Sequence, residues 1–514
     1  KQRIKVLRET GRMELRDKNI LVFGLAESGV GASNLLASLG AKVTVTDSKP
    51  KEALMKYVEK LLPSIRLSLG GHPDGILQGV DMIVLSPGVP PDIASLKKAK
   101  EMGIRIIGEL ELAYQVINSK FIPTWSGQSS KFPKFLAITG TNGKSTTTTL
   151  LNEMLNKGGF RTILGGNIGN ALTEEIGKLI QDAGYKIQDN INHASCIMHH
   201  ASIDFIVAEV SSFQLEAIEM FRPDGASLLN ITPDHMDRYH SMEKYKDAKA
   251  QIFANQREGD FLVLNADDIE TMRLYDSRCS PQASRRGDKI QDSRLPGAYF
   301  FSRKKAVEGV YFKDGVIYSN FNSSLLTLNS QLIHADEINI KGVHNLENAM
   351  AASAMALLAG CSADAVISAL KDFEGLEHRL ELVREFEGVD YINDSKGTNA
   401  DAVVKSLESF SMPVILIAGG RDKDGDFSLL SSLIKSRVKK LVLIGEAREK
   451  IKKVLGVLTE TIFADNLEEA VMISRKSASK GDVVLLSPAC ASFDMFRDYK
   501  DRGEQFKKIV KGLS

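Results

Sequence analysis

The chain has 514 residues, of which 43% are hydrophobic and 25% are charged, and its formal net charge is +1. A near-neutral chain lacks the basic field that holds nucleic acid, so we exclude nucleic acid as a partner. The length predicts about three domains, and the longest apolar run, near residues 349–360, is too short to cross a bilayer, which excludes a membrane-spanning protein.

The four cysteines form no recognisable metal or disulfide motif. Cys196, Cys279, Cys361 and Cys490 are far apart and contain no C-x-x-C pair. This spacing argues against a zinc finger or a disulfide framework and favours a reducing compartment, so we predict a cytoplasmic protein. The first residues are basic but lack the apolar stretch of a signal peptide, and Met13 is a candidate for the natural start.

The first segment alternates strands and helices. Residues 19–23 predict a buried strand, followed by a Gly-rich turn and a helix, and residues 42–46 predict a second strand that ends at Asp47. A third strand, 82–85, ends in a Ser-Pro-Gly turn. This order is typical of a dinucleotide-binding unit, but the turn reads G-x-x-x-x-G and not G-x-G-x-x-G. A tight turn without a ligand is therefore an equal alternative.

The most informative segment is the loop Gly140-Thr-Asn-Gly-Lys-Ser145. It follows a Ser-, Gly- and Pro-rich linker (122–133) and an apolar strand (135–138), and it precedes a Thr-rich helix. Backbone N–H groups and the helix N-terminus favour a phosphate there, Lys144 can reach the outer phosphates, and the Ser145 hydroxyl can ligate Mg²⁺. We therefore predict a nucleoside triphosphate site; the alternative is an accidental turn, since the loop is shorter than the usual P-loop.

Three further residues of the central segment are candidate metal ligands. Glu209 ends an apolar strand (205–210), where a carboxylate can hold Mg²⁺, although it could instead cap the next helix. His235 follows a second strand (226–231) and could be an ordinary loop residue. Lys249 closes a polar helix, and composition alone predicts a solvated lysine.

Two stretches of the central segment resemble insertions. Residues 185–202 are polar and contain His193, His199 and His200, which lack metal-ligand spacing and are expected to be exposed. Residues 277–296 are charged. Both are predicted surface loops that are dispensable for chemistry.

The last segment, from about residue 376, carries strands at 414–418, 441–444 and 483–486 and predicts another α/β sheet. Before it, Asn345 and Asn348 share one helix face and could bind a base or cap the helix. Arg379 suits a phosphate. The loops 393–399 and 487–496 combine acid, base and hydroxyl groups after strands, which favours ligand binding over simple turns.

Together these motifs resemble the Mur ligase family, and within it the D-glutamate-adding branch. The resemblance covers residues 19–510 and rests on Gly165-Gly-Asn-Ile-Gly169, the Ser-Ser-Phe-Gln-Leu-Glu run after Val210, Asp234-His-Met-Asp-Arg-Tyr239, and the loops 393–399 and 487–494. The last two loops separate this branch from its relatives. The Asp-Asn-Pro-Arg motif of the diaminopimelate- and lysine-adding branch is absent.

The resemblance implies an α/β fold of three domains. These are an N-terminal Rossmann-like domain for the UDP substrate (1–121), a central P-loop ATPase-type domain (122–375), and a C-terminal Rossmann-like domain for the amino acid (376–514). It also implies the site residues, with Lys144, His235 and Lys249 in catalytic roles. The ATP site would comprise Gly140, Thr141, Asn142, Gly143, Lys144, Ser145, Thr146, Asn345, Asn348, Arg379 and Asp394. The nucleotide-sugar site would comprise Glu27, Ser28, Asp47, Lys49, Gly88 and Asn167, the amino-acid site Thr398, Lys423, Ser492, Phe493 and Tyr499, and the metal site Ser145, Glu209, His235 and Lys249.

The implied reaction adds D-glutamate to UDP-N-acetylmuramoyl-L-alanine through an acyl phosphate, in peptidoglycan precursor synthesis. It implies ATP, two Mg²⁺ ions and a carbamylated Lys249, in an enzyme that we expect to be a monomer. Tyr499 stands where the family often has Phe, which affects the lining of the amino-acid pocket. The alternatives are a folylpolyglutamate synthase, which shares the loop type, and an ATP-binding regulator without ligase activity.

Overall fold

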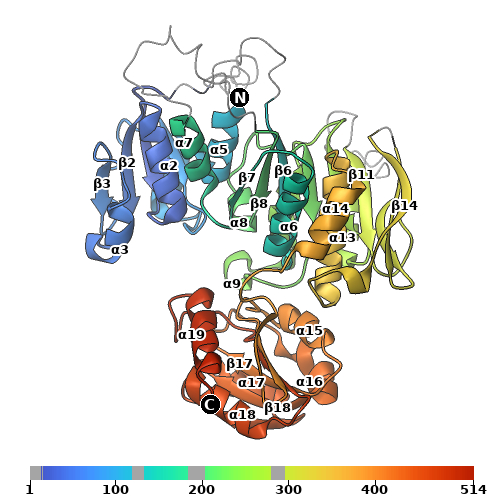
Figure 1. Cartoon of the computed structure of the whole chain (residues 1–514). Helices are drawn as coiled ribbons and strands as arrows, with labels where there is room; N and C mark the ends of the chain where they lie inside the picture. The colour runs from blue at the N-terminus through green and yellow to red at the C-terminus, as the bar shows by residue number, and fades with distance from the viewer. Residues whose placement is uncertain are drawn as a thin grey trace.

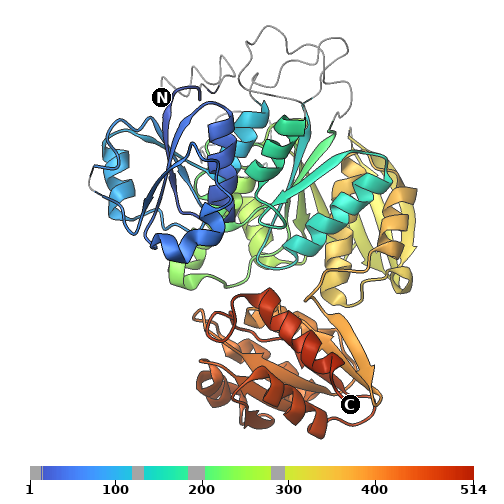
Figure 2. The ribbon, with the colours of Figure 1, turned by 60° about the vertical axis from the view of Figure 1, so that its left-hand side comes forward.

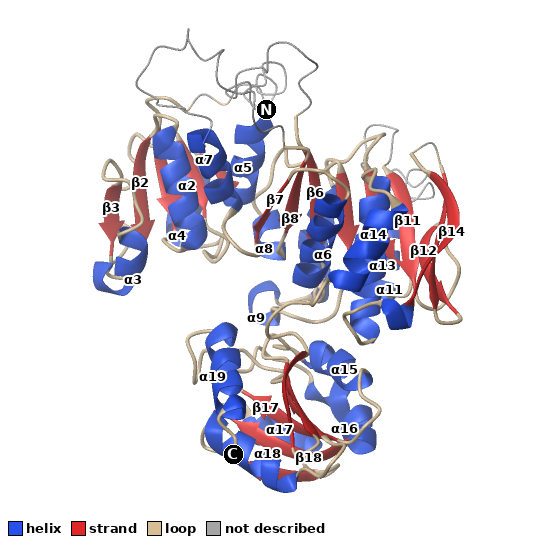
Figure 3. Ribbon diagram, viewed as in Figure 1, coloured by secondary structure: helices blue, strands red, loops and turns tan. Residues whose placement is uncertain are grey.

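The computed structural model describes residues 13, 15–73, 75–118, 132–182, 203–278, 296–323 and 325–514. These residues form three β-sheets in succession along the chain, each flanked by helices (Figures 1 and 3). The three-domain α/β fold predicted from the sequence is confirmed. Among the described helices, none is both long and apolar enough to span a membrane.

The first sheet is parallel, with strand order β3-β2-β1-β4-β5. The order reverses between β1 and β4, and in such doubly wound sheets ligands bind at that switch point, beyond the carboxyl ends of the strands. Its strands are β1 (Asn19–Phe23), β2 (Lys42–Asp47), β3 (Arg66–Leu69), β4 (Met82–Leu85) and β5 (Arg105–Gly108), and its helices are α2 (Glu27–Ser38), α3 (Lys51–Val58), α4 (Ala94–Glu101) and α5 (Glu109–Asn118).

The central sheet has the order β14-β13-β12-β11-β10-β9-β6-β8-β7, parallel from β7 to β12 and antiparallel from β12 to β14. Its strands are β6 (Lys134–Thr139), β7 (Thr162–Gly166), β8 (Phe205–Glu209), β9 (Gly225–Leu228), β10 (Phe261–Asn265), β11 (Gly297–Ser302), β12 (Gly309–Lys313), β13 (Val316–Asn322) and β14 (Thr327–His334). Its longer helices are α6 (Lys144–Lys157), α7 (Leu172–Asp182), α10 (Met242–Ala250), α11 (Ile269–Arg278), α13 (Val343–Leu358) and α14 (Ala363–Asp372).

The third sheet has the order β15-β16-β20-β17-β18-β19, and only β15 is antiparallel to its neighbour. Its strands are β15 (Glu381–Phe386), β16 (Val389–Asn393), β17 (Val414–Gly419), β18 (Val438–Ile444), β19 (Glu460–Phe463) and β20 (Val483–Leu486). Its helices are α15 (Ala400–Glu408), α16 (Ser431–Arg437), α17 (Arg448–Leu455), α18 (Leu467–Ser477) and α19 (Tyr499–Lys511).

One apolar cluster spans the first two sheets, whereas the third sheet has clusters of its own. Buried side chains of α5 and α7 join the first sheet to the central one in a single cluster. The buried Glu111 carboxylate strengthens this junction, because it accepts the backbone N–H groups of Glu219, Met220 and Phe221 at 2.9 Å. Figure 2 shows the third sheet, in orange and red, facing the other two across their lower edge.

The strand predicted at 226–231 is shorter than expected. The chain leaves β9 after Leu228. The Asn230 side chain then holds the phosphate loop, accepting the Asn142 N–H at 2.8 Å. Backbone bonds to the segment after β6 also continue there, because the Leu229 N–H donates to Thr139 O and the Thr141 N–H donates to Asn230 O, each at 3.0 Å.

Several predictions fall outside the described residues. These are the linker up to residue 131, the loop 185–202 with its three histidines, and residues 279–295 of the second insertion. The domain limits after residues 121 and 375 stay predictions.

Candidate active site

The predicted phosphate loop joins β6 to the N-terminus of α6. Gly143 caps the helix with φ 85°, and a Cβ there would lie 2.3 Å from Asn348 Oδ1, so both backbone conformation and space require glycine. Lys144 folds back over the loop, its Nζ donating to Gly140 O at 3.0 Å and Thr141 O at 2.8 Å. The ammonium therefore lies over the turn where an anion would sit.

A cavity of about 460 Å³ opens beside this loop, between the central and third sheets. Most residues predicted for ATP, metal and amino-acid binding line it, together with Asn167 of the predicted nucleotide-sugar site, although they come from distant parts of the sequence. They are Thr141, Asn142, Gly143, Lys144, Ser145, Thr146, Asn167, Glu209, His235, Lys249, Asn345, Asn348, Arg379, Asp394, Thr398, Lys423 and Phe493.

Glu209 offers this cavity a buried carboxylate. It ends β8, and its Oε1 accepts a hydrogen bond from Asn167 Nδ2 at 2.6 Å. Its Oε2 is buried without a hydrogen-bond partner among the described residues. A buried anionic oxygen is costly unless it is paired, so this atom suits a bound cation.

His235 lies in the loop that follows β9, and its backbone is left-handed, with φ 56°. The edge of its ring packs against Phe213, with ring centroids 4.8 Å apart. Burial lowers the pKa of His235 to about 4, so the imidazole is neutral at pH 7. A neutral ring can ligate a metal or accept a hydrogen bond from an incoming amine.

Lys249 corrects the expectation from composition. The side chain that composition alone placed in solvent is 1% exposed. Its Nζ donates to Gly140 O at 2.7 Å and lies 4.6 Å from the centre of the Tyr245 ring. Burial holds the pKa of this amine well below its usual value. The last turn of the polar helix α10 is buried because the phosphate loop covers that turn.

The third sheet's loops reach across to the phosphate loop. Arg379 Nη2 donates to Ser145 Oγ at 3.1 Å, and Asn142 Nδ2 donates to Asp401 Oδ2 at 2.7 Å. Lys423 Nζ forms an ion pair with Asp234 Oδ1 at 2.9 Å. The two domains therefore meet through polar groups around the cavity, an arrangement that can open and close around a ligand.

Among the other predicted residues of this region, Asp394 has structural partners. The Asp394 carboxylate accepts the hydroxyls of Ser406 at 2.7 Å and Ser487 at 2.6 Å, and burial raises its pKa to about 6. Ser492 is buried, and Phe493 is 63% exposed beside the cavity. Gly140, Ser492 and Tyr499 do not line the cavity themselves.

Lys396 and Asp234 line the cavity but were not predicted as site residues. Lys396 lines the cavity, with its Nζ 3.7 Å from the centre of the Tyr499 ring, and burial lowers the pKa of its amine to about 7. Tyr499 thus contacts a cavity-lining side chain without lining the cavity itself. Both residues lie in loops that contain predicted site residues. The polar composition of these loops was the feature of the sequence that could have identified them.

Of the six residues predicted for a nucleotide sugar, Asn167 lines the cavity, whereas the other five lie elsewhere, at the carboxyl end of the first sheet. Glu27 and Ser28 follow β1, Asp47 and Lys49 follow β2, and Gly88 follows β4. Asp47 Oδ2 accepts the Leu25 N–H at 2.8 Å, joining two of these loops, and Glu27 pairs with Lys60 at 3.0 Å. None of the five lines the cavity beside the phosphate loop.

Comparison with known proteins gives matches along the whole chain. Family profiles described as Mur ligase MurD-like N-terminal domain, Mur ligase middle domain, and Mur ligase glutamate ligase domain match residues 18–108, 138–356 and 378–490. The chain is 44% identical over 500 residues to the UDP-N-acetylmuramoylalanine–D-glutamate ligase of Citrifermentans bemidjiense, covering 97% of this chain and 98% of that protein. It is 43% identical to the same-named ligase of Thermoanaerobacter pseudethanolicus, covering 98% and 100%.

Among solved structures, the chain is similar to the UDP-N-acetylmuramate-alanine ligase MurC of Thermotoga maritima. The TM-score is 0.56 at 17% identity, over 96% of this chain and 99% of that one. At this identity the likeness concerns the fold alone.

Proposed function

Because this chain belongs to the Mur ligase family, we propose that it adds D-glutamate to UDP-N-acetylmuramoyl-L-alanine at the expense of ATP, in peptidoglycan precursor synthesis. The observation that carries this function is full-length identity of 44% to a ligase of that name. The polar cavity between the phosphate loop and the third sheet supports it, because it gathers the residues that such a reaction requires. The same identity favours this function over a folylpolyglutamate synthase or a regulator.

In this reaction a carboxylate oxygen of the alanyl group attacks the γ-phosphorus, and ADP leaves. The amine of D-glutamate then attacks the acyl carbon, loses a proton, and displaces phosphate. The main requirements are positioning and neutralisation of crowded negative charge. The N-terminus of α6, Lys144 and Arg379 supply positive potential at the phosphates, since all three meet at Ser145 or its loop.

The donor set of the cavity fits Mg²⁺. Glu209 offers an unpartnered buried oxygen, His235 a neutral ring, and Ser145 a hydroxyl. We propose that these groups and a carbamylated Lys249 hold two Mg²⁺ ions, which when bound would neutralise charge on the transferring phosphate. The buried Lys249 amine supports carbamylation, because only an uncharged amine reacts with CO₂.

We propose that the amino acid binds to the third domain, through Thr398, Lys423, Ser492 and Phe493, above Tyr499. Lys423 already holds one carboxylate, that of Asp234. Binding of D-glutamate would replace this partner with a substrate carboxylate. A monomeric state and a cytoplasmic location stay predictions.

Lys423→Ala is expected to raise the KM for D-glutamate about tenfold or more while changing the KM for ATP much less. A charge-assisted hydrogen bond contributes about 1.5–3 kcal/mol, and about 1.4 kcal/mol corresponds to a factor of ten. Steady-state kinetics with each substrate varied in turn measure both constants. Lys450→Ala is the control, because Lys450 pairs with Asp422 in the same domain and does not line the cavity. Equal increases in both KM values for Lys423→Ala would contradict the assignment.

The proposed function is tested by leaving out one substrate at a time. ADP release and formation of the dipeptidyl product should both require UDP-N-acetylmuramoyl-L-alanine and D-glutamate together with ATP. A folate substrate that replaced the nucleotide sugar, or ATP hydrolysis indifferent to both co-substrates, would support one of the alternatives.

A further inference from the structure

We propose that Arg238 is a positioning residue for the nucleotide-sugar substrate. It holds the loop after β4 (residues 86–89, the β4 loop) against the segment of the central domain that carries His235. This inference rests on the proposed function, because it concerns how one domain's substrate loop is fixed relative to the other domain's reaction site.

The β4 loop lies where a ligand of the first domain is expected. It follows β4, next to the turn after β1, at the switch point of the doubly wound sheet. Ser86 Oγ is buried and donates to Gly24 O at 2.9 Å, which joins the two loops. A displacement of the β4 loop would therefore be transmitted to the turn that begins α2.

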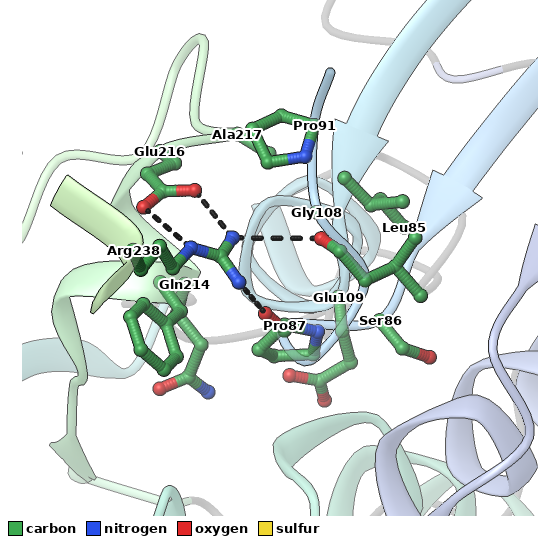
Figure 4. Close-up of a pocket in the computed structure, with 12 residues that line it drawn as sticks. Leu85, Ser86, Pro87, Pro91, Gly108, Glu109, Gln214, Glu216, Ala217 and Arg238 are labelled. Carbon is green, nitrogen blue, oxygen red and sulfur yellow. Dashed lines mark hydrogen bonds and ion pairs between the residues drawn. The ribbon is translucent and has the colours of Figure 1, made fainter. Parts of the chain in front are cut away.

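Arg238 reaches this loop from the central domain. It lies on the short helix α9 (Met236–Tyr239), directly after His235. Its Nη2 binds Glu216 Oε2 at 2.6 Å, while Nη1 and Nη2 donate to the carbonyl oxygens of Pro87 and Val89, each at 3.4 Å (Figure 4). Glu216 orients the guanidinium firmly, whereas the two longer bonds are individually weak and act as a pair.

The bond to the Pro87 carbonyl orients the next peptide group. In a trans peptide the C=O of one residue and the N–H of the next point in opposite directions. Holding Pro87 O toward Arg238 therefore turns the Gly88 N–H away from it. Gly88 is exposed, and within the described part of the chain its N–H has no protein acceptor. This donor is free to bind an anionic group of the substrate.

Phe213 connects the same arginine to His235. The Arg238 guanidinium lies 4.2 Å from the centre of the Phe213 ring, and the His235 ring meets Phe213 at 4.8 Å. The guanidinium thus contacts the substrate loop and shares a neighbour with a predicted metal ligand. The Arg238 side chain thereby links the β4 loop to the reaction site at His235, and the extended substrate must span both.

The test compares Arg238→Met with a matched variant, Arg105→Met. Arg105 also joins the first two domains, pairing with Glu219 at 2.7 Å, and the two ion pairs are similarly buried: 23% and 27% exposed for Arg105 and Glu219, 17% and 18% for Arg238 and Glu216. Arg105 contacts neither the β4 loop nor the cavity in the described contacts. It therefore reports the effect of losing an interdomain bridge alone.

Arg238→Met is expected to raise both the KM and the calorimetric Kd for UDP-N-acetylmuramoyl-L-alanine about tenfold, with the KM for ATP within about twofold. Arg105→Met should lower thermal stability and leave both constants within about twofold. If Arg238→Met does not fold, Arg238→Lys, which keeps the charge but has a single donor nitrogen in place of the guanidinium fork, should give an intermediate rise of about threefold.

An unchanged Kd in the Arg238 variants, or an equal rise in Arg105→Met, would overturn the inference. Failure of the unmodified enzyme to bind the nucleotide sugar would instead refute the proposed function, so the two failures are distinguishable.

Discussion

Lys144→Ala is expected to abolish ligation while leaving the fold intact, with kcat falling by about a thousandfold. Lys144 begins α6, and its Nζ is bound only to the loop carbonyls of Gly140 and Thr141 among the described groups. The ammonium is thus held at the point where phosphates would collect. Its removal leaves the charge that develops during phosphoryl transfer without this side-chain cation.

The control for this variant is Lys157→Ala at the other end of the same helix. Lys157 pairs with Asp372 and lies outside the cavity. Circular dichroism and thermal melting check that both variants fold, and initial rates of product formation measure their activity. Near-normal turnover of Lys144→Ala with an unchanged ATP requirement would remove the phosphate loop from the mechanism.

Lys249→Ala is also expected to be nearly inactive, and a small added carboxylate should partly restore it. A charged lysine would repel Mg²⁺ beside Glu209 and His235, whereas a carbamate offers an anionic oxygen of the kind that Mg²⁺ prefers. Burial of Lys249 favours the uncharged amine, the form that reacts with CO₂, since it lowers the amine's pKa. Added acetate or formate could occupy the space that the side chain leaves.

Two comparisons distinguish a carbamylated Lys249 from a lysine with a purely structural role. Lys246→Ala, on the same helix and paired with Glu270 at 2.6 Å outside the cavity, should keep its activity and gain nothing from carboxylate. The unmodified enzyme should lose activity after exhaustive CO₂ removal at slightly acidic pH and recover it with bicarbonate. A fully active Lys249→Ala variant would exclude the carbamate.

The sequence predicted those parts of the site that follow directly from local order. The order of a strand, a Gly-rich turn and a helix predicts the phosphate loop. Glu209, His235 and the loop 393–399 were predicted because they are polar and follow apolar strands. The carboxyl ends of parallel strands share one edge, so such residues gather without further information. The antiparallel strands β12, β13 and β14 gave no comparable signal, because their pairing depends on neighbours rather than on motif chemistry.

What the sequence could not give depends on contacts between distant segments. Helix α10 is polar, and nothing in its own pattern shows that the phosphate loop buries Lys249. The ion pair between Lys423 and Asp234 joins residues 189 positions apart. Arg238 had appeared only as part of a motif, and its contacts with the β4 loop emerge once two domains are placed together.

Ligation through an acyl phosphate is tested most directly with UDP-N-acetylmuramoyl-L-alanine labelled with ¹⁸O in its terminal carboxylate. A carboxylate oxygen that attacks the γ-phosphorus leaves with phosphate when the amine displaces it. If the reaction proceeds through an acyl phosphate, the phosphate released for each product formed carries one ¹⁸O atom, which mass spectrometry detects. Unlabelled phosphate alongside normal product formation would contradict it.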